Sequence, residues 1–487
     1  MTFSVENILL LGSILLFVSV VASKTSFTFG IPTLILFLIV GMLAGSDGPG
    51  GIYFNDPQTA QFLGVMALTL ILFSGGLDTK WEVIKPVLRS GIALSTLGVL
   101  TTTILVGIFT SYLLGYSIIE GLLLGAIVSS TDAAAVFSIL RSRSVGLKGV
   151  LRPLLELESG SNDAMAYFLT ISFIYLVKEQ DASIASLIPK FFIGMVLGAG
   201  SGYLFGRIMI WVINRIKLDI VGLYPVLILS LVFFTFSFTD AIGGNGFLAV
   251  YISAIILGNS NFIHKKSLMK FYDGQAWLMQ IIMFLTLGLL VFPMQIVPII
   301  PQGIMISLFL IFVARPLAVF LSLSFSKGLN FRKKLFISWV GLRGAAPIVF
   351  ATYPLLAHIH YAGTIFNLVF FISLSSVMLQ GTTLPLMAKW LHVSVPAKLK
   401  RKFPLDIERG NDVKSELIEL DILDNSPAIG RAIIRLKLPK TASIVLIERD
   451  EKYFNAEGDT VIQAGDHLLI TADNKNTAEK VHACFNV

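Results

Sequence analysis

The sequence predicts an all-α polytopic membrane protein with a small α/β domain at its C-terminal end. Of its 487 residues, 55% are hydrophobic and only 14% are charged, whereas a soluble domain is about 25% charged. The apolar residues gather in runs long enough to cross a bilayer, which takes about 20 mostly apolar residues. Charged residues become frequent only after about Lys398.

Thirteen segments qualify as spanning helices, at residues 5–23, 30–46, 59–77, 90–115, 119–140, 150–177, 184–206, 219–238, 245–260, 272–292, 302–325, 334–357 and 363–390. Lys and Arg favour cytoplasmic loops. Loops after odd-numbered segments carry 18 of them, against 2, Lys178 and Lys190, after even-numbered segments. We therefore expect a multi-pass protein of the bacterial inner membrane, with its N-terminus outside and its C-terminus cytoplasmic. The first segment lacks a basic flank and a small-residue cleavage site, so we expect it to be retained.

Charge and cysteine content exclude other classes of function. The net charge is +7, but the basic residues lie in short loops rather than on one patch, so no nucleic-acid partner is expected. The single cysteine, Cys484, makes neither an intramolecular disulfide nor a Cys-based metal site. No cofactor is predicted.

The C-terminal part predicts a separate domain over residues 405–487, joined by a linker at 393–404 to the membrane domain at 1–392. "ASIVLIERD" and "HLLITAD" read as strands. "SPAIGRAIIRL" predicts a helix, with Ser426 as its N-cap before Pro427. The domain contains no G-x-G-x-x-G and no P-loop, so a complete nucleotide-binding fold is not predicted.

Two pairs of short motifs indicate an internal repeat. "LAGS" at 43–46 matches "LGNS" at 257–260, and "TDAAAV" at 131–136 matches "RGAAPIV" at 343–349. The two offsets, 214 and 212 residues, each cross seven predicted helices. Because seven is odd, the copies run in opposite directions, as in the inverted-topology repeats of secondary transporters.

Ionisable residues at bilayer depth cost at least about 2.5–3.5 kcal/mol and are therefore candidates for function. The predicted helices contain six: Asp132, Glu156, Glu158, Asp163, Arg315 and Arg343. An alternative is that such residues only join helices. A Ser would do that at lower cost, so the two aspartates favour function. Glu156 is the exception, since we expect it at the helix edge beside Arg152, in a structural role.

The stretch "LELESGSNDAMAYFL", residues 155–169, carries most of these groups. On a helix Ser159 shares a face with Asp163, and Glu158 shares the adjacent face with Asn162. Asp163 and Ser159 offer hard oxygen ligands, and Asn162 offers a carbonyl and an amide. Glu158 needs a partner, because a lone buried carboxylate would take up a proton.

Two other predicted helices contain helix-weakening residues at matching places of the repeat. "SSTDAAAV" holds Ser130 and Asp132, and "GLRGAAPIV" holds Gly341, Gly344 and Pro347. Interrupted helices of this kind free backbone carbonyls for a small cation near the bilayer midplane. We expect the ion site where these two interruptions meet the 155–169 helix.

A buried aspartate beside a second one binds either a proton or a cation near physiological pH. If the empty charged site cannot cross the membrane, the chain exchanges one ion for the other by alternating access. Two rival readings remain open here. An intramembrane aspartyl protease also uses two aspartates but needs a GxGD context, which is absent. A cation channel would need a ring of carbonyls from a symmetric oligomer.

Together, "SSTDAAAV", "LLELESGSND" and "WVGLRGAAPIV" resemble the signatures of the NhaP-type monovalent cation:proton antiporters, over roughly residues 1–392. "ELESGSND" followed by a cytoplasmic domain is similar to the potassium/proton branch. The domain itself resembles TrkA-C, the C-terminal half of the regulatory domain of potassium transport proteins. The resemblance implies thirteen helices, a homodimer and electroneutral K⁺/H⁺ exchange, with Na⁺ as the alternative cation.

The resemblance also implies roles for single residues. Asp163 is the carboxylate that carries ion or proton, and Asp132 with Thr131 and Ser159 completes the cation site. Asn162 stands where a second Asp would make exchange electrogenic. Glu158 pairs with Arg343, and Arg315 and Ser130 are further candidates. Ser74 replaces an acid found in many relatives, which leaves cation preference open. The C-terminal domain binds a small regulatory ligand or serves only in assembly.

Overall fold

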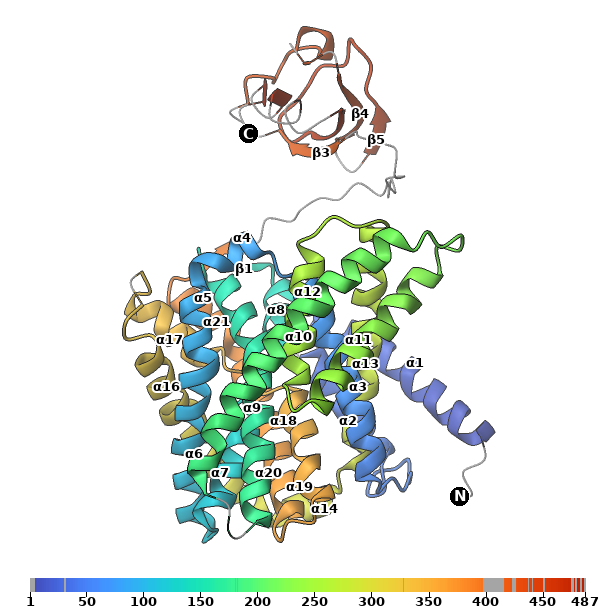
Figure 1. Cartoon of the computed structure of the whole chain (residues 1–487). Coiled ribbons are helices and arrows are strands. Elements are labelled where there is room, and N and C mark those ends of the chain that lie inside the picture. The colour runs from blue at the N-terminus through green and yellow to red at the C-terminus, as the bar shows by residue number, and fades with distance from the viewer. Residues whose placement is uncertain are drawn as a thin grey trace. The chain divides into compact units, whose positions relative to one another are not determined.

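The computed structural model describes residues 5–29, 32–179, 181, 183–326, 328–396, 416–422, 426–436, 438–439, 441–449, 452–473, 477, 480–481 and 484–485. The chain divides into two compact units (Figure 1), a membrane unit at Met1–Ala397 and a C-terminal unit at Lys398–Val487. Each unit is described by itself.

The helices of the membrane unit pack into two bundles. The first bundle, mostly on the right of the membrane unit in Figure 1, packs around α3 and α13. Its members are α1 (Val5–Phe29), α2 (Thr33–Ala44), α3 (Pro57–Asp78), the 3-10 turn η3 (Ile184–Ser186), α10 (Leu187–Arg215), α11 (Leu223–Ala241), α12 (Gly246–Gly258) and α13 (Lys265–Leu290).

The second bundle packs around α9 and α20 and holds the polar motifs. Its first half is α4 (Trp81–Ile84), η1 (Lys85–Val87), α5 (Leu88–Ala93), η2 (Leu94–Gly98), α6 (Val99–Leu114), α7 (Ile118–Ile127), α8 (Ala133–Ser142) and α9 (Leu151–Lys178). Its second half is α14 (Pro293–Ile296), η4 (Val297–Ile299), α15 (Ile300–Phe309), η5 (Leu310–Ala314), α16 (Arg315–Ser322), α17 (Phe331–Trp339), α18 (Ala345–Phe350), α19 (Thr352–Leu356), α20 (Ala362–Ser376), η6 (Val377–Gly381) and α21 (Thr382–Trp390).

The two halves of the second bundle repeat each other element by element. α4 and α14 begin 212 residues apart, at Trp81 and Pro293, and both are followed by a 3-10 turn that contains a proline. Each half then contains a wide π-helical turn, η2 or η5. A proline near the start of a helix and a π-bulge within it are local deviations with identifiable causes. Their repetition at this offset agrees with the repeat predicted from the motifs.

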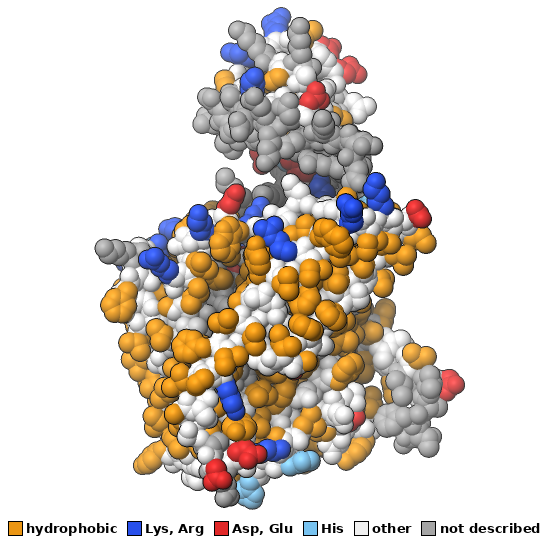
Figure 2. All heavy atoms as spheres, in the orientation of Figure 1, with side chains coloured by type: hydrophobic (Ala, Val, Ile, Leu, Met, Phe, Trp, Pro, Cys, Tyr) orange, Lys and Arg blue, Asp and Glu red, His pale blue; other side chains and the backbone are white. Residues whose placement is uncertain are grey.

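The surface of the membrane unit is apolar around its sides. Figure 2 shows hydrophobic side chains covering the visible flank, with Lys and Arg concentrated along one end, which we call the basic end. Seven of the described helical segments are long and apolar enough to cross a membrane, and shorter apolar helices accompany them. Each predicted segment coincides with one helix or a run of consecutive helices. The number of crossings stays a prediction.

The predicted end of the membrane domain at residue 392 is too early. Ser394–Pro396 form strand β2, which pairs antiparallel with β1 (Val145–Leu147) between α8 and α9. The amide of Lys148 also donates to the carbonyl of Val393 at 2.9 Å. These backbone hydrogen bonds attach the first residues of the predicted linker to the membrane unit.

The C-terminal unit is an antiparallel sheet in the order β3-β6-β4-β5. Its strands are β3 (Glu416–Asp421), β4 (Ala442–Arg449), β5 (Lys452–Asn455) and β6 (His467–Ala472). Ile447, Leu468 and Phe485 lie in its core, and Cys484 packs against it. The Arg449 guanidinium donates to both carboxylate oxygens of the buried Asp466, at 2.7 and 2.8 Å.

The two predicted strands of the C-terminal unit are confirmed as β4 and β6. The helix predicted over residues 426–436 is wrong. Only the 3-10 turn η7 (Ile433–Arg435) forms there, because Gly430 has φ +76° and Ala432 pairs with Val461 across an isolated bridge. Both features interrupt helical hydrogen bonding. Ser426 instead donates its hydroxyl to the carbonyl of Phe485 at 3.1 Å.

Candidate functional site

Two helix interruptions cross at the centre of the second bundle. Residues 128–132 separate α7 from α8, and residues 340–344 separate α17 from α18. The Asp132 amide donates to the carbonyl of Leu342 at 2.8 Å. The Arg343 side chain donates through Nη1 to the carbonyls of Ser129 at 2.6 Å and Ser130 at 2.7 Å. The prediction of two interrupted, crossing helices is confirmed.

A polar relay from α20 and η6 supports the second interruption. The Arg343 amide donates to the hydroxyl of Ser376 at 3.1 Å, and this hydroxyl donates to Gln380 Oε1 at 2.6 Å. Gln380 Nε2 donates in turn to the carbonyl of Trp339 at 2.8 Å. These contacts satisfy backbone groups that the broken helix leaves unpaired. Sequence reasoning missed both residues, although a Gln inside an apolar helix is a signal for such a role.

Helix α9 presents its polar face to the first interruption. The Ser159 hydroxyl accepts from the Ala133 amide at 3.0 Å and donates to the carbonyl of Thr131 at 2.9 Å. Asn162 Nδ2 donates to the Thr131 hydroxyl at 2.6 Å. The Ser130 hydroxyl donates to Asp163 Oδ1. The predicted residues from the two helices therefore converge at one place.

Asp132 sits at the start of α8, where its side chain accepts the Ala135 amide at 3.0 Å and caps the helix. Its carboxylate also lies against Gly344, since a Cβ added there would overlap it. Asp132 and the buried Asp163, which is 5% exposed, are close enough to interact electrostatically. Two carboxylates and two free-ended half-helices thus share one small volume.

The Oδ1 atom of Asn162 is buried without a hydrogen-bond partner. A buried amide oxygen without a donor costs free energy and is normally satisfied by water or a ligand. It lies among the hydroxyls of Ser130, Thr131 and Ser159. The site therefore has an oxygen available for a guest, in addition to its carboxylates.

The predicted pairing of Glu158 with Arg343 is wrong. Arg315 Nη2 lies 2.6 Å from Glu158 Oε1, and both side chains are almost fully buried. Arg343 is committed to the carbonyls at the first interruption, so its position in the crossing, rather than its charge, fixes its partner. Arg315, which stands at the junction of η5 and α16, fills the role that the sequence assigned to Arg343.

Two other predictions concern residues around the site. Glu156 pairs with Arg152 at 2.8 Å on the more exposed first turns of α9, which confirms its structural role at the helix edge. Ser74 is buried in α3, which belongs to the first bundle. It therefore lies on a different bundle from the α9 carboxylate.

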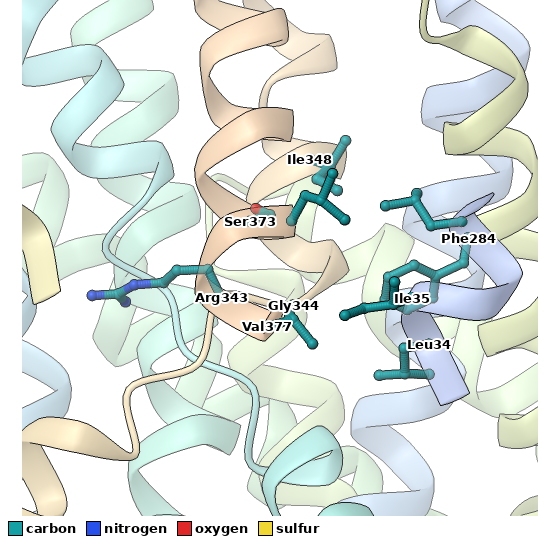
Figure 3. Close-up of a pocket in the computed structure, with 10 residues that line it drawn as sticks. Leu34, Ile35, Phe284, Arg343, Gly344, Ile348, Ser373 and Val377 are labelled. Atoms are coloured by element: carbon teal, nitrogen blue, oxygen red, sulfur yellow. The ribbon is translucent and has the colours of Figure 1, made fainter. Parts of the chain in front are cut away.

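An apolar cavity lies on the other side of the crossing, between the two bundles. It is lined by α2 and α13 from the first bundle and by residues around α18 and α20 from the second, among them Leu34, Phe284, Gly344, Ile348 and Ser373. Figure 3 shows the guanidinium of Arg343 pointing away from this cavity. Its lining offers little to an ion, so the cavity is a gap between bundles rather than the ion site.

The chain matches a family model described as sodium/hydrogen exchanger, transmembrane, over residues 10–390. Residues 417–481 match the TrkA-C domain model. It is 38% identical over 484 residues to a protein of Shewanella sp. (strain ANA-3) named K(+)/H(+) antiporter NhaP2, covering 97% of this chain and 82% of that protein. A protein of Alkalimonas amylolytica, named K(+)/H(+) antiporter NhaP, is 38% identical over 466 residues, covering 95% of this chain and 80% of that protein.

The fold is similar to that of the sodium proton antiporter MjNhaP1 from Methanocaldococcus jannaschii at pH 8. The TM-score is 0.68 at 24% identity, and the match covers 78% of this chain and 97% of that one. This likeness concerns the fold. The family match over most of the membrane unit and the 38% identity over nearly the whole chain show membership directly. The chain belongs to the sodium/hydrogen exchanger family and carries a TrkA-C domain.

Proposed function

We propose that the chain is a secondary transporter that exchanges a monovalent cation, K⁺ in preference to Na⁺, for H⁺ across the membrane. Cation and proton compete for Asp163, and the two helix interruptions provide alternating access. Support for K⁺ comes from the names of the Shewanella and Alkalimonas relatives. A protein of Aphanothece halophytica named Na(+)/H(+) antiporter ApNhaP supports the Na⁺ alternative, at only 25% identity.

The observation that carries the proposal is how the charges near Asp163 are balanced. Both buried arginines of the second bundle are engaged elsewhere, Arg315 with Glu158 and Arg343 with backbone carbonyls. Asp163 instead accepts from a neutral hydroxyl and lies near a second carboxylate. A buried carboxylate in these surroundings is stable only when a proton or a cation neutralises it. Competition between the two ions follows.

The ligands we assign to the cation are Asp132, Asp163, Thr131, Ser159 and Asn162, all of which offer oxygen. Alkali cations are hard and prefer oxygen ligands, as do other hard cations. The unpartnered Oδ1 of Asn162 supports its place in this set. Asn162 adds no charge, so one cation or one proton neutralises the site equally well, which supports electroneutral exchange of one for one.

We infer that the basic end faces the cytoplasm and that the protein lies in a bacterial inner membrane. The gathering of Lys and Arg at one end (Figure 2) supports this orientation through the positive-inside rule. A homodimer is inferred from the family resemblance. The C-terminal unit is proposed either to bind a small regulatory ligand or to serve only in assembly.

The test is ion exchange in proteoliposomes that contain a pH-sensitive dye and hold an imposed proton gradient. Adding K⁺ should dissipate the gradient at lower concentration than Na⁺, and Asp163→Asn should abolish the response. Asp219→Asn, in an exposed loop, is the matched control and should exchange normally. If neither cation moves protons, or if Asp163→Asn exchanges at the wild-type rate, the proposal is overturned. If Na⁺ acts before K⁺, the Na⁺/H⁺ alternative replaces it.

A further inference from the structure

Tyr167 lies on α9 one helical turn beyond Asp163. Residues four apart share a helix face, and the rise of about 1.5 Å per residue places Tyr167 about 6 Å further along the axis. This is the direction away from Arg152 and the basic end. The Tyr167 hydroxyl donates to Asp240 Oδ1 at 3.2 Å. An exposed carboxylate near the end of α11 is thus attached to the helix that carries the ion site.

This hydrogen bond joins the two bundles. Tyr167 belongs to α9 of the second bundle, and Asp240 belongs to α11 of the first. A second bond lies beside it, from Asn245 Nδ2, in the short α11–α12 connection, to the carbonyl of Ala164 at 2.7 Å. The connection between α11 and α12 is therefore fastened to α9 directly beyond Asp163.

Aromatic rings fill the space around Tyr167. Its ring centroid lies 5.1 Å from that of Phe247 on α12, 5.6 Å from that of Tyr353 on α19 and 6.1 Å from that of Phe350 on α18. Phe247 and Phe350 are fully buried and lie 6.1 Å apart. These rings come from both bundles, so the seal that they form is an interface between bundles.

The opposite side of the site is more open. Asp132 and Ser159 are partly exposed and Ala134 is exposed. α8 continues from Ala134 to Arg141 at the end of that helix, towards the basic end. In this conformation the site is therefore accessible from the basic end and closed towards the other end, which we call the outer face.

We propose that Tyr167 and Asp240 form an interbundle latch that holds the outer end of the ion path closed. They are positioning residues for exchange at the outer face. This inference rests on the proposed function. An ion that reaches Asp163 from the outer face must pass between the bundles at this place, so the hydrogen bond has to break in each cycle.

A latch present in only one conformation shifts the equilibrium between the two. When it is removed, the outward-open conformation gains population at the expense of the closed one. Apparent affinity follows the population of the competent conformation. The apparent KM for the cation should then fall at the outer face and stay equal or rise at the basic end. A merely structural defect lowers the rate or weakens binding at both faces.

The experiment uses the full-length protein in right-side-out and inside-out vesicles, with K⁺ and then Na⁺ as probes, so that the apparent KM is measured from each face. Tyr167→Phe removes the hydroxyl and keeps the ring, and Asp240→Asn removes the charge at an exposed position with little change of shape. Tyr112→Phe is the matched control, since Tyr112 is 90% exposed on α6.

We expect each latch variant to lower the outer apparent KM by on the order of tenfold, the effect of losing one hydrogen bond to a charged group. The double variant should add little to either single one, and Tyr112→Phe should match wild type. Unchanged values, or shifts in the same direction at both faces, would overturn the latch while wild-type exchange stands. If wild type itself exchanges neither cation, the proposed function fails instead, and the latch falls with it.

Discussion

Arg315 and Glu158 form a buried ion pair between η5–α16 and α9, with Nη2 and Oε1 2.6 Å apart. Removing one partner leaves the other charge buried and uncompensated, which typically costs about 3–5 kcal/mol. We therefore expect Glu158→Gln and Arg315→Gln each to lower the thermal unfolding temperature in detergent strongly. The double variant should lose less than the sum of the single ones.

The control for this pair is Glu156→Gln, which breaks the partly exposed pair with Arg152. Exposed pairs contribute about 0–1 kcal/mol, so this variant should unfold close to wild type. A Glu158→Gln protein that is as stable as the Glu156→Gln protein would contradict a stabilising role for the buried pair.

Arg343 joins the two helix interruptions through Nη1, which donates to two carbonyls of the α7–α8 break. Lysine keeps the charge but lacks the planar, forked geometry of a guanidinium. Arg343→Lys should reduce exchange by about tenfold or more, because hydrogen bonds to charged groups are worth about 1.5–3 kcal/mol. Arg207→Lys, on the exposed face of α10, should exchange like wild type in the same flux assay.

Gly344 leaves room for the Asp132 carboxylate, which a Cβ at that position would overlap. Gly344→Ala should therefore displace Asp132 and suppress exchange as strongly as Asp132→Asn does. Gly75→Ala is the matched control, because a Cβ added at Gly75 meets nothing within 4 Å in helix α3. That substitution should keep full exchange and stabilise the helix by about 0.5–1 kcal/mol. Equal activity of the two alanine variants would show that Asp132 tolerates displacement.

Asp466 is fully buried and holds Arg449 in a bidentate pair, while its Oδ2 also accepts the Gln463 amide at 2.8 Å. Asp466→Asn should destabilise the C-terminal unit by about 3–5 kcal/mol. Limited proteolysis of the full-length protein should then cleave this unit faster and spare the membrane unit. Asp459→Asn, at an exposed turn, should be digested at the wild-type rate.

Asp56 caps the first turn of α3 outside the apolar span. The hydroxyl of Thr59, with the amides of Thr59 and Gln58, lowers the pKa of Asp56 below its ordinary value of 3.8. A lowered folded-state pKa means that this contribution is complete above the ordinary value and is lost as pH falls through the folded value. Asn caps as well without titrating. The stability difference between wild type and Asp56→Asn should therefore change only on the acid side, in thermal unfolding as a function of pH.

Several features of this protein follow from its sequence alone. Apolar runs must become helices in lipid, because the bilayer offers no partner for unpaired backbone groups. The glycines, the proline and the small residues around Asp132 and Arg343 mark where two of those helices break. The i, i+4 spacing of Ser159 and Asp163 places both on one face of α9. Local propensity and periodicity are enough for each of these conclusions.

Other features depended on the tertiary structure. Which arginine neutralises Glu158 depends on where α16 and the α17–α18 break lie around α9, and the sequence contains two candidates at bilayer depth. Ser376 and Gln380 reach the broken helix from a distant segment, which no local pattern shows. In the C-terminal unit, the cross-strand pairing of Ala432 overrode a helical pattern. In each case contacts between segments far apart in the chain selected one partner among several that local chemistry allowed.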